Sequence, residues 1–430
     1  MKKILFALLV LSSKSYATTM REAISVVANQ TQDGKIANEL SVENEAYYAN
    51  IAGAKQTISQ YIPTPYLFYS YSNPFSTVLS SSASSSLTIP TGFITGLKQE
   101  NYGFAVDYNI ASLPQALKKV QSVGISRSAA RNTMEGKKAE FYYNLANVYI
   151  ELYRAEETLN LQKKIYETAK SRFAEIQKNA QYGMASKKDI LLAESELLQS
   201  EMSLENSHNV VKNAQAKYQE KFQTLHTNLE LSDGFLSEIA TNIEDLKAKI
   251  LQNQNVIALN QTAKTYKIES TIDKFNMLPK VTLTYRNLIN HPDSSLGFPN
   301  YTQSTFAVNV NFNLLNVSNY LGSKRNYHES KKKMAEAKIV KNSYETEAVN
   351  LWNDVRHCES LIVVLTKVVN NSREVYNITK NEVRSGTKSF AEELRTKQDF
   401  HAAELNLIEA RLKKAQNIQR LKFLTGARAF

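Results

Sequence analysis

The chain has 430 residues, a formal net charge of +11 and a single cysteine. One cysteine excludes an intrachain disulfide. The mild positive charge lies in short clusters rather than along a basic stripe with interleaved aromatic residues, so we expect no nucleic-acid partner. The length would allow two or three compact domains, but the distribution of the prolines indicates one elongated, duplicated body instead.

The first 17 residues are predicted to be a signal peptide. Lys2 and Lys3 give a basic start, an apolar run follows from Ile4 to Leu11, and a small-residue cleavage site ends at Ala17. The apolar run is too short to span a bilayer as a helix. We therefore expect a secreted chain whose mature form begins near Thr18.

All eight prolines lie in two short islands. The first island holds Pro63, Pro65, Pro74, Pro90 and Pro114, and the second holds Pro279, Pro292 and Pro299. Because proline interrupts helices, each island is expected to be non-helical, whereas the proline-free stretch after it is expected to be long helix. The pattern predicts one unit that occurs twice.

Each island is predicted to contain two β-strands. In the first, an aromatic-rich strand at 66–71 precedes a Ser-rich loop that includes 80–86, and a strand at 102–110 follows. In the second, strands at 281–286 and 306–312 flank a further loop. Apolar and polar residues alternate in the last three of these strands, which gives each an apolar face and a polar face.

Such strands suit either a water-facing sandwich or an outer-membrane barrel with a polar lumen. The signal peptide, the aromatic-rich strand ends and the long Ser-rich loop favour the barrel. Four strands cannot close a barrel, and an open sheet edge is not tolerated in lipid. We therefore expect other copies of the chain to complete the sheet.

Long helices are predicted after each island. One runs from Pro114 to about Gln181, on the order of 100 Å at ~1.5 Å per residue. A helical segment at 19–60 precedes the first island, and shorter helices around a turn at 232–234 link the two units. Two heptad seams are typical of coiled-coil packing. They are Ile190, Ala193, Leu197, Ser200, Leu204, Ser207, Val211, Ala214 and Tyr218, and then Ala391, Leu394, Gln398, His401, Leu405, Ile408, Leu412 and Ala415.

The sequence contains no pattern that indicates an enzyme. Its six histidines are scattered, and no phosphate-binding loop, dinucleotide-binding glycine pattern or nucleophile elbow is present. His357 and Cys358 are adjacent, so on a helix they point in different directions. Cys358 is expected to be a small buried apolar residue. We expect no catalytic residues, no metal and no cofactor.

This order of elements resembles the TolC-type outer-membrane efflux protein family, the outer membrane factors. The resemblance covers essentially the whole mature chain: helix, Ile62-Pro63, two strands, long helix, glycine turn and long helix, then the same order again from Leu278-Pro279. It implies a mainly α fold with a small β part, built from a duplicated strand-strand-helix-helix unit. It further implies a homotrimer with a twelve-stranded outer-membrane β-barrel, four strands per chain, that continues into a long periplasmic α-helical barrel.

The duplication divides the chain into three segments: a signal peptide at 1–17, a first structural repeat at 18–228 and a second at 229–430. The most specific local match to the family is a pair of glycine turns between the long helices. Glycine supplies the positive φ needed at a helix C-terminus, and the serine after it can cap the next helix. The resemblance implies that these helix tips contact an adaptor protein. The tip residues are Gly183, Met184, Ala185, Ser186, Gly386 and Thr387.

A carboxylate follows each glycine by six residues, namely Asp189 and Glu392. The resemblance places the second acid at the constricted end of the duct, where a threefold ring of Glu392 would favour cations. The alternative is a first-turn acid that opposes the helix dipole, and this fits Asp189 better. Arg395 stands where members of the family have a second acid, and it could pair with Glu392, so ion selectivity stays open. Lys388 matches a basic position that links neighbouring tips in the family.

We therefore predict an outer-membrane exit duct of a tripartite efflux or type I secretion system. It would passively carry solutes or polypeptide from an inner-membrane transporter and a periplasmic adaptor (membrane fusion) protein, with outer-membrane lipid around the barrel and the helical part in the periplasm. Two other classes stay open: a periplasmic coiled-coil adaptor or scaffold, and a trimeric surface adhesin. The cargo is not encoded in a recognisable pattern.

Overall fold

The computed structural model describes 18–20, 22–25, 27, 38–59, 62–72, 99–110, 113–183, 185–222, 229–231, 239–292, 300–312 and 316–426. The signal peptide at 1–17, the Ser-rich loop at 80–86, the turn at 232–234 and the tip residue Met184 lie outside the described residues. The predicted helical segment at 19–60 lies partly outside them, at 28–37, and is helical at 38–59. None of the helices in the described ranges combines the length and the apolar character that crossing a bilayer requires.

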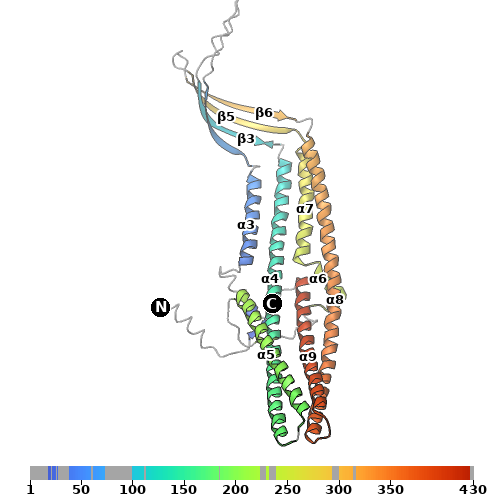
Figure 1. Cartoon of the computed structure of the whole chain (residues 1–430). Coiled ribbons are helices and arrows are strands. Elements are labelled where there is room, and N and C mark those ends of the chain that lie inside the picture. Colours follow the sequence, from blue (N-terminus) through green and yellow to red (C-terminus); the bar gives the residue numbers. More distant parts are fainter. Residues whose placement is uncertain are drawn as a thin grey trace, which may run out of the picture. The chain divides into compact units, whose positions relative to one another are not determined.

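Apart from two strands of two residues each at 18–19 and 229–230, where helix was expected, the elements follow one another in the order that the sequence predicts (Figure 1). They are β1 (Thr18–Thr19), α3 (Asn38–Ser59), β2 (Thr64–Ser72), β3 (Gln99–Asn109), α4 (Leu113–Gln181), α5 (Lys187–Phe222), β4 (Leu229–Glu230), α6 (Ile243–Ile250), α7 (Gln254–Phe275), β5 (Lys280–Pro292), β6 (Tyr301–Asn311), α8 (Val317–Arg384) and α9 (Phe390–Leu424). The mainly helical fold with two pairs of longer strands is confirmed, and α4 ends at the predicted residue.

All four strands are longer than predicted, and two of them differ most. β5 continues to Pro292 and β6 begins at Tyr301, whereas the alternation of apolar residues covers only 281–286 and 306–312. The backbone pairing continues through polar residues, up to Asn290 opposite Tyr301. Alternation marks the apolar part of a strand, while hydrogen bonding between backbones does not depend on it.

The chain forms two compact units. Unit 1 takes its described residues from 1–46, 131–257 and 337–430, and unit 2 from 47–130 and 258–336. Each unit draws on both halves of the sequence. The predicted repeats at 18–228 and 229–430 follow the order of elements rather than compactness, and they stay a prediction.

Unit 2 contains a four-stranded antiparallel sheet with the strand order β2-β3-β5-β6 (Figure 1). Phe104 lies opposite Asn287, and Tyr285 lies opposite Phe306. Among the described strands, β2 pairs only with β3 and β6 pairs only with β5. The sheet therefore has two open edges.

The apolar face of this sheet is exposed. Leu67 is 85% exposed, Phe306 67% and Val310 67%. On the opposite face Ala105 is fully buried and Thr284 is 8% exposed. A water-facing sandwich would bury its apolar face, so the sheet has the reverse polarity, as expected for strands that face lipid.

Unit 1 is held together by apolar clusters between its helices. In one, Tyr149 of α4 is fully buried, and its hydroxyl donates to the carbonyl of Glu230 at 2.8 Å. The rings of Tyr218 and Phe222 stack in the same cluster with centroids 4.2 Å apart. A second cluster joins Leu246 of α6, Trp352 of α8 and Leu421 of α9. Cys358 is buried, as predicted.

The first predicted heptad seam is confirmed. The buried residues of α5 are Ala193, Ser200, Ser207, Val211, Ala214, Tyr218 and Phe222, of which all but the last belong to the predicted seam. Every third or fourth residue of α5 therefore packs against its neighbours, as in a coiled coil.

The second predicted seam is wrong at the start of α9. Ala391 and Gln398 are exposed there. The buried residues are instead Phe390, Glu393, Lys397 and Phe400. An apolar pattern passes over Glu393 and Lys397 because they are charged, although each is buried in an ion pair. Further along α9, Leu412 and Ala415 are buried as predicted.

Candidate functional site

The two helix tips of unit 1 turn on glycines with positive φ. Gly183 has a φ of 73° and Gly386 a φ of 77°, as the sequence predicts. The backbone N–H of Gly183 donates to the carbonyl of Ala180 at 3.0 Å, and that of Gly386 donates to Val383 at 3.1 Å. These bonds satisfy carbonyls that the helix ends leave free. Each turn thus ends one long helix and starts the next.

Both predicted gate acids cap their own helices. The Asp189 carboxylate accepts from the backbone N–H of Ser186 at 3.1 Å and from its hydroxyl at 2.6 Å, and the N–H of Asp189 donates back to that hydroxyl. Ser389 and Glu392 form the same reciprocal capping box at the start of α9. The structural role of these acids is therefore to satisfy helix N-termini.

The two predicted basic residues differ in their contacts. The amine of Lys388 lies 2.8 Å from the Glu382 carboxylate, and this hydrogen bond raises the pKa of Lys388. Arg395 is exposed on α9. No salt bridge of the described residues joins it to Glu392, so the pairing considered from their spacing is absent.

A buried ion-pair cluster behind the tips was missed by sequence reasoning. Arg172 of α4 donates to the carboxylate of Glu393 in α9, whose side chain is 3% exposed. The same guanidinium donates to Glu175 at 2.7 Å, and Arg384 of α8 lies 3.5 Å from Glu175. The cluster therefore connects α4 with both helices of the second hairpin. The available signal was the pair of adjacent acids at the start of α9, because only the first is needed for the cap.

A second buried pair joins the hairpins one helical turn further on. Lys397 of α9 lies 2.6 Å from Glu196 of α5, and the two side chains are 5% and 12% exposed. His401 follows on α9, where its ring lies 3.3 Å from Glu404. Two salt bridges thus link the first hairpin to the second: one joins α4 to α9, and the other joins α5 to α9.

Burial sets the protonation behaviour of this cluster. It raises the pKa of Glu393 above its usual value, an effect that the charge of Arg172 opposes. Burial would lower the pKa of Arg172, but the hydrogen bond to Glu175 and the charges of both carboxylates raise it. Burial also raises the pKa of Tyr376 to about 12 and lowers that of His401. A buried pair that loses one partner leaves an uncompensated charge, so the cluster is costly to break.

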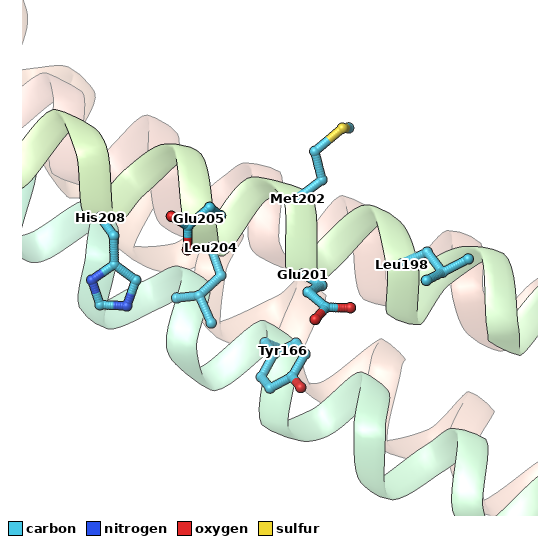
Figure 2. A pocket seen from close by; sticks show the side chains of 7 residues that line it. All are labelled: Tyr166, Leu198, Glu201, Met202, Leu204, Glu205 and His208. Atoms are coloured by element: carbon cyan, nitrogen blue, oxygen red, sulfur yellow. The ribbon is translucent and has the colours of Figure 1, made fainter.

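A shallow groove lies between α4 and α5. It is lined by Tyr166 of α4 and, on α5, by Leu198, Glu201, Met202, Leu204, Glu205 and His208 (Figure 2). Leu198 and Met202 are 59% and 61% exposed, so the groove is open to solvent. No group of three or more metal-ligating side chains occurs in the described part of the chain. The groove offers a contact surface rather than an enclosed reaction site.

Part of the chain matches a known protein family. Residues 252–427 match the family model described as outer membrane efflux protein. A search of curated proteins by sequence found no match.

Several solved structures share the fold over most of both chains. CusC is 10% identical with a TM-score of 0.79, covering 95% of this chain and 92% of its own. VceC from Vibrio cholerae is 11% identical with a TM-score of 0.78, covering 94% and 96%. The open state of the MtrE channel from Neisseria gonorrhoeae is 12% identical with a TM-score of 0.76, covering 95% and 88%. At these identities the likeness establishes the fold and not the cargo.

Proposed function

We propose that this chain, which belongs to the outer membrane efflux protein family, forms the exit duct of a tripartite efflux or type I secretion system. The chain is an outer-membrane efflux channel and not an enzyme, and its helical part lies in the periplasm. The duct would carry solutes or polypeptide passively, with the energy supplied by an inner-membrane transporter that acts through a periplasmic adaptor protein.

The observation that carries the proposal is the open sheet with an exposed apolar face. Four strands with unpaired edges cannot lie in lipid, because each unpaired backbone group there costs several kcal/mol. Three copies would supply twelve strands and close the sheet, with residues such as Leu67 and Phe306 toward lipid. The exposed apolar face also argues against a water-soluble adaptor or scaffold.

The exposed apolar residues of α8 support the homotrimer. They include Val363, Val364, Val375 and Ile378, which are between 50% and 60% exposed. Exposed apolar side chains that recur along a helix mark a contact surface. We assign this surface to the neighbouring copy. The repeats at 18–228 and 229–430 would then alternate around the wall of the duct.

The gate is proposed to lie at the helix tips. Glu392, Arg395, Asp189 and Lys388 stay candidates for lining the constriction, although two of them also cap helices. For the tips to splay, the second hairpin has to move away from the first. The pairs Arg172–Glu393 and Lys397–Glu196 join the two hairpins, so they would hold the gate closed.

Adaptor contact is proposed for the exposed tip residues. Gly183, Ser186, Gly386 and Thr387 are exposed, Ala185 is half-buried, and Tyr182 beside them is 67% exposed. Small residues and one exposed ring allow a partner to approach the backbone closely. Met184 belongs to the same predicted surface and lies outside the described residues.

Two measurements on detergent-extracted protein test the function. Native mass spectrometry should give a trimer, and the trimer should conduct ions in a planar bilayer. The Arg172→Gln, Lys397→Gln double variant should raise the open fraction, while Arg154→Gln, which breaks the exposed pair with Glu409, should not. A monomer that needs no detergent would refute the duct. An unchanged open fraction in the double variant would refute the gate alone.

A further inference from the structure

Unit 2 contains a pair of neighbouring helices whose charges are segregated. The hydroxyl of Ser330 in α8 donates to the carbonyl of Ala263 in α7 at 2.8 Å, and Ser270 of α7 contacts Ser323 of α8 at 2.9 Å. The later residue of one helix meets the earlier residue of the other, so the helices are antiparallel. The contact residues Ser270 and Ser330 therefore serve as the zero point from which the angular position of every other residue on α7 and α8 is measured.

The acids lie on one side of this contact together with Lys333, which pairs with Glu336, and five other lysines lie on the opposite side. At about 100° per residue, Glu269 and Asp273 lie about 100° and about 60° from Ser270 in one direction, whereas Lys267 and Lys274 lie about 60° and about 40° in the other. On α8 the same geometry separates Glu329 and Glu336 from Lys324 and Lys331. Because the helices are antiparallel, residues displaced in the same angular direction from the contact, each about its own helix axis, lie on the same side of the pair. The lysines thus share one face.

The lysine face is free of counter-charge. Glu269, Glu329 and Glu336 pair with other bases, namely Lys119, Lys332 and Lys333. In the described ranges no salt bridge involves the lysines of this face, all of which are exposed. These lysines are Lys264, Lys267, Lys274, Lys324 and Lys331. A hydrogen bond from Lys331 lowers the pKa of Tyr327 on α8, and the charges of Lys267 and Lys274 on α7 add to this, which agrees with a shared face.

The lysines lie on the convex side of the helix layer. Helix α7 contacts α4 through Glu269, which lies 2.8 Å from Lys119, and through Gln261, whose amide donates to Ser128 at 3.0 Å. Measured from the α8 contact on the acidic side, these two residues lie at about 100° and about 180°. The contact with α4 is thus centred at about 140° from the contact with α8. Because this angle is less than half a turn on the acidic side, the layer bends away from the lysines. In a closed duct, a step that rests on the proposed function, the convex side is the outside.

The lysine face also adjoins the sheet. Lys274 is one residue from the end of α7 and six residues before β5 begins, and Lys324 lies in the second turn of α8 after β6. Tyr320 is 49% exposed, and the Lys324 amine lies 4.7 Å from the centre of its ring. Tyrosine and lysine at the end of a membrane-facing segment are typical of the headgroup layer. We propose that Lys274 and Lys324 bind the phosphates of phospholipid headgroups at the periplasmic surface of the outer membrane.

The position of each lysine predicts how much it contributes. Lys264 and Lys331 lie about 16 Å and about 21 Å along their helices from the ends next to the sheet, at ~1.5 Å per residue. The headgroup layer is about 5–7 Å thick, and attraction to an anionic surface falls off within about 8 Å. A lysine at such a surface strengthens binding about fivefold. Lys274 and Lys324 should therefore matter, and Lys264 and Lys331 should not.

Two double variants with the same change of charge test the proposal. Phosphatidylglycerol is titrated into the detergent-solubilised full-length protein, and bound lipid is counted by native mass spectrometry with phosphatidylcholine as the reference. Lys274→Gln with Lys324→Gln should weaken binding of phosphatidylglycerol on the order of 25-fold. Lys264→Gln with Lys331→Gln should weaken it less than about threefold.

Equal weakening by the two double variants would point to an extended polyanion and overturn the lipid assignment. An absence of preference for phosphatidylglycerol in the unaltered protein would overturn it as well. A change of ion selectivity in Lys274→Gln with Lys324→Gln, with lipid binding unchanged, would place these lysines inside the duct and refute the proposal. Failure to form a trimer would refute the proposed function instead.

Discussion

The two helix tips of unit 1 have the same backbone turn, but apolar side chains pack behind the first tip and a buried ion pair lies behind the second. Each has a glycine with positive φ, a serine cap three residues later and an acid that completes the capping box. The next position differs, since Ile190 is half-buried in an apolar cluster at the first tip, whereas Glu393 is buried against Arg172 at the second. The turn is thus conserved between the two tips while the packing behind it is not.

This difference separates two kinds of stabilisation. The turn and the cap are local, because every bond in them joins residues within a few positions of each other. The ion pair joins Arg172 and Glu393, which lie far apart in the chain. Each side chain supplies the opposite charge that allows the other to be buried. A local device can be used twice without adjustment, but a buried pair requires a partner on another helix. The second tip is therefore the one whose position depends on the first hairpin.

The largest test of this comparison is to remove one partner of the buried pair. Arg172→Gln leaves the buried Glu393 carboxylate without its hydrogen-bonded cationic partner, and we expect a loss of stability on the order of 3 kcal/mol. The apparent thermal midpoint of detergent-solubilised protein, followed by circular dichroism, measures it. Arg154→Gln is the matched control, because Arg154 and Glu409 form an exposed pair worth about 0–1 kcal/mol.

If the two arginine variants lower the midpoint equally, burial of the Arg172 pair has no special weight and the tips do not differ as described.

The Ile190 position offers the reverse experiment. Ile190→Glu places a carboxylate in the apolar cluster of the first tip, whose buried members are Ile176, Ala193 and Phe390. It should destabilise the protein more than Glu393→Ile, which removes a charge from the interior and leaves Arg172 paired with Glu175.

The same contrast explains what the sequence could predict. The glycine turns, the caps, the end of α4 and the α5 seam follow from local rules, and all were found. The α9 seam near the tip was misplaced by one residue because Glu393 and Lys397 interrupt the apolar pattern that defines a seam. Their burial depends on Arg172 and Glu196, which lie on other helices. Pairing between distant residues leaves no periodic signal in the chain.

The glycines test whether the two turns are in fact equivalent. Gly183→Ala and Gly386→Ala each place a side chain at positive φ in open space, so only backbone strain is added. We expect each to cost about 1 kcal/mol. Gly53→Ala is the control, because this glycine lies inside α3 with no atom near an added Cβ, and the change should stabilise the helix by up to about 1 kcal/mol. Unequal losses at the two tips would show that their turns are not alike.

Removing the serine caps sharpens the comparison further. Ser186→Ala and Ser389→Ala each remove the hydroxyl that accepts from one backbone N–H at a helix start, that of Asp189 or Glu392, at a cost of about 1 kcal/mol. Because the caps are local, the cost should be the same in the unaltered protein and in the Arg172→Gln background. Additivity of the thermal midpoints checks this. A Ser389→Ala loss that depends on Arg172 would mean that cap and ion pair act together.

The smallest expected effect concerns His401 on the second hairpin, whose counterpart on the first is the exposed Leu198. Burial lowers the pKa of His401; the nearby Lys397 charge adds to this, while Glu404 on its own helix and Glu196 of α5 oppose it. The folded protein then binds fewer protons than the unfolded chain just below about pH 6.5, so the stabilising contribution is complete above that pH and is lost as the pH falls toward the folded-state pKa. Between about pH 7.5 and about pH 5, His401→Gln should therefore lose less thermal stability than the unaltered protein. Leu198→Gln, which changes the counterpart without adding or removing a titrating group, should keep the unaltered pH dependence. If His401→Gln instead shows the same pH dependence of thermal stability as the unaltered protein, protonation of His401 does not destabilise the fold. The charged interior of the second hairpin would then be insensitive to pH at this position.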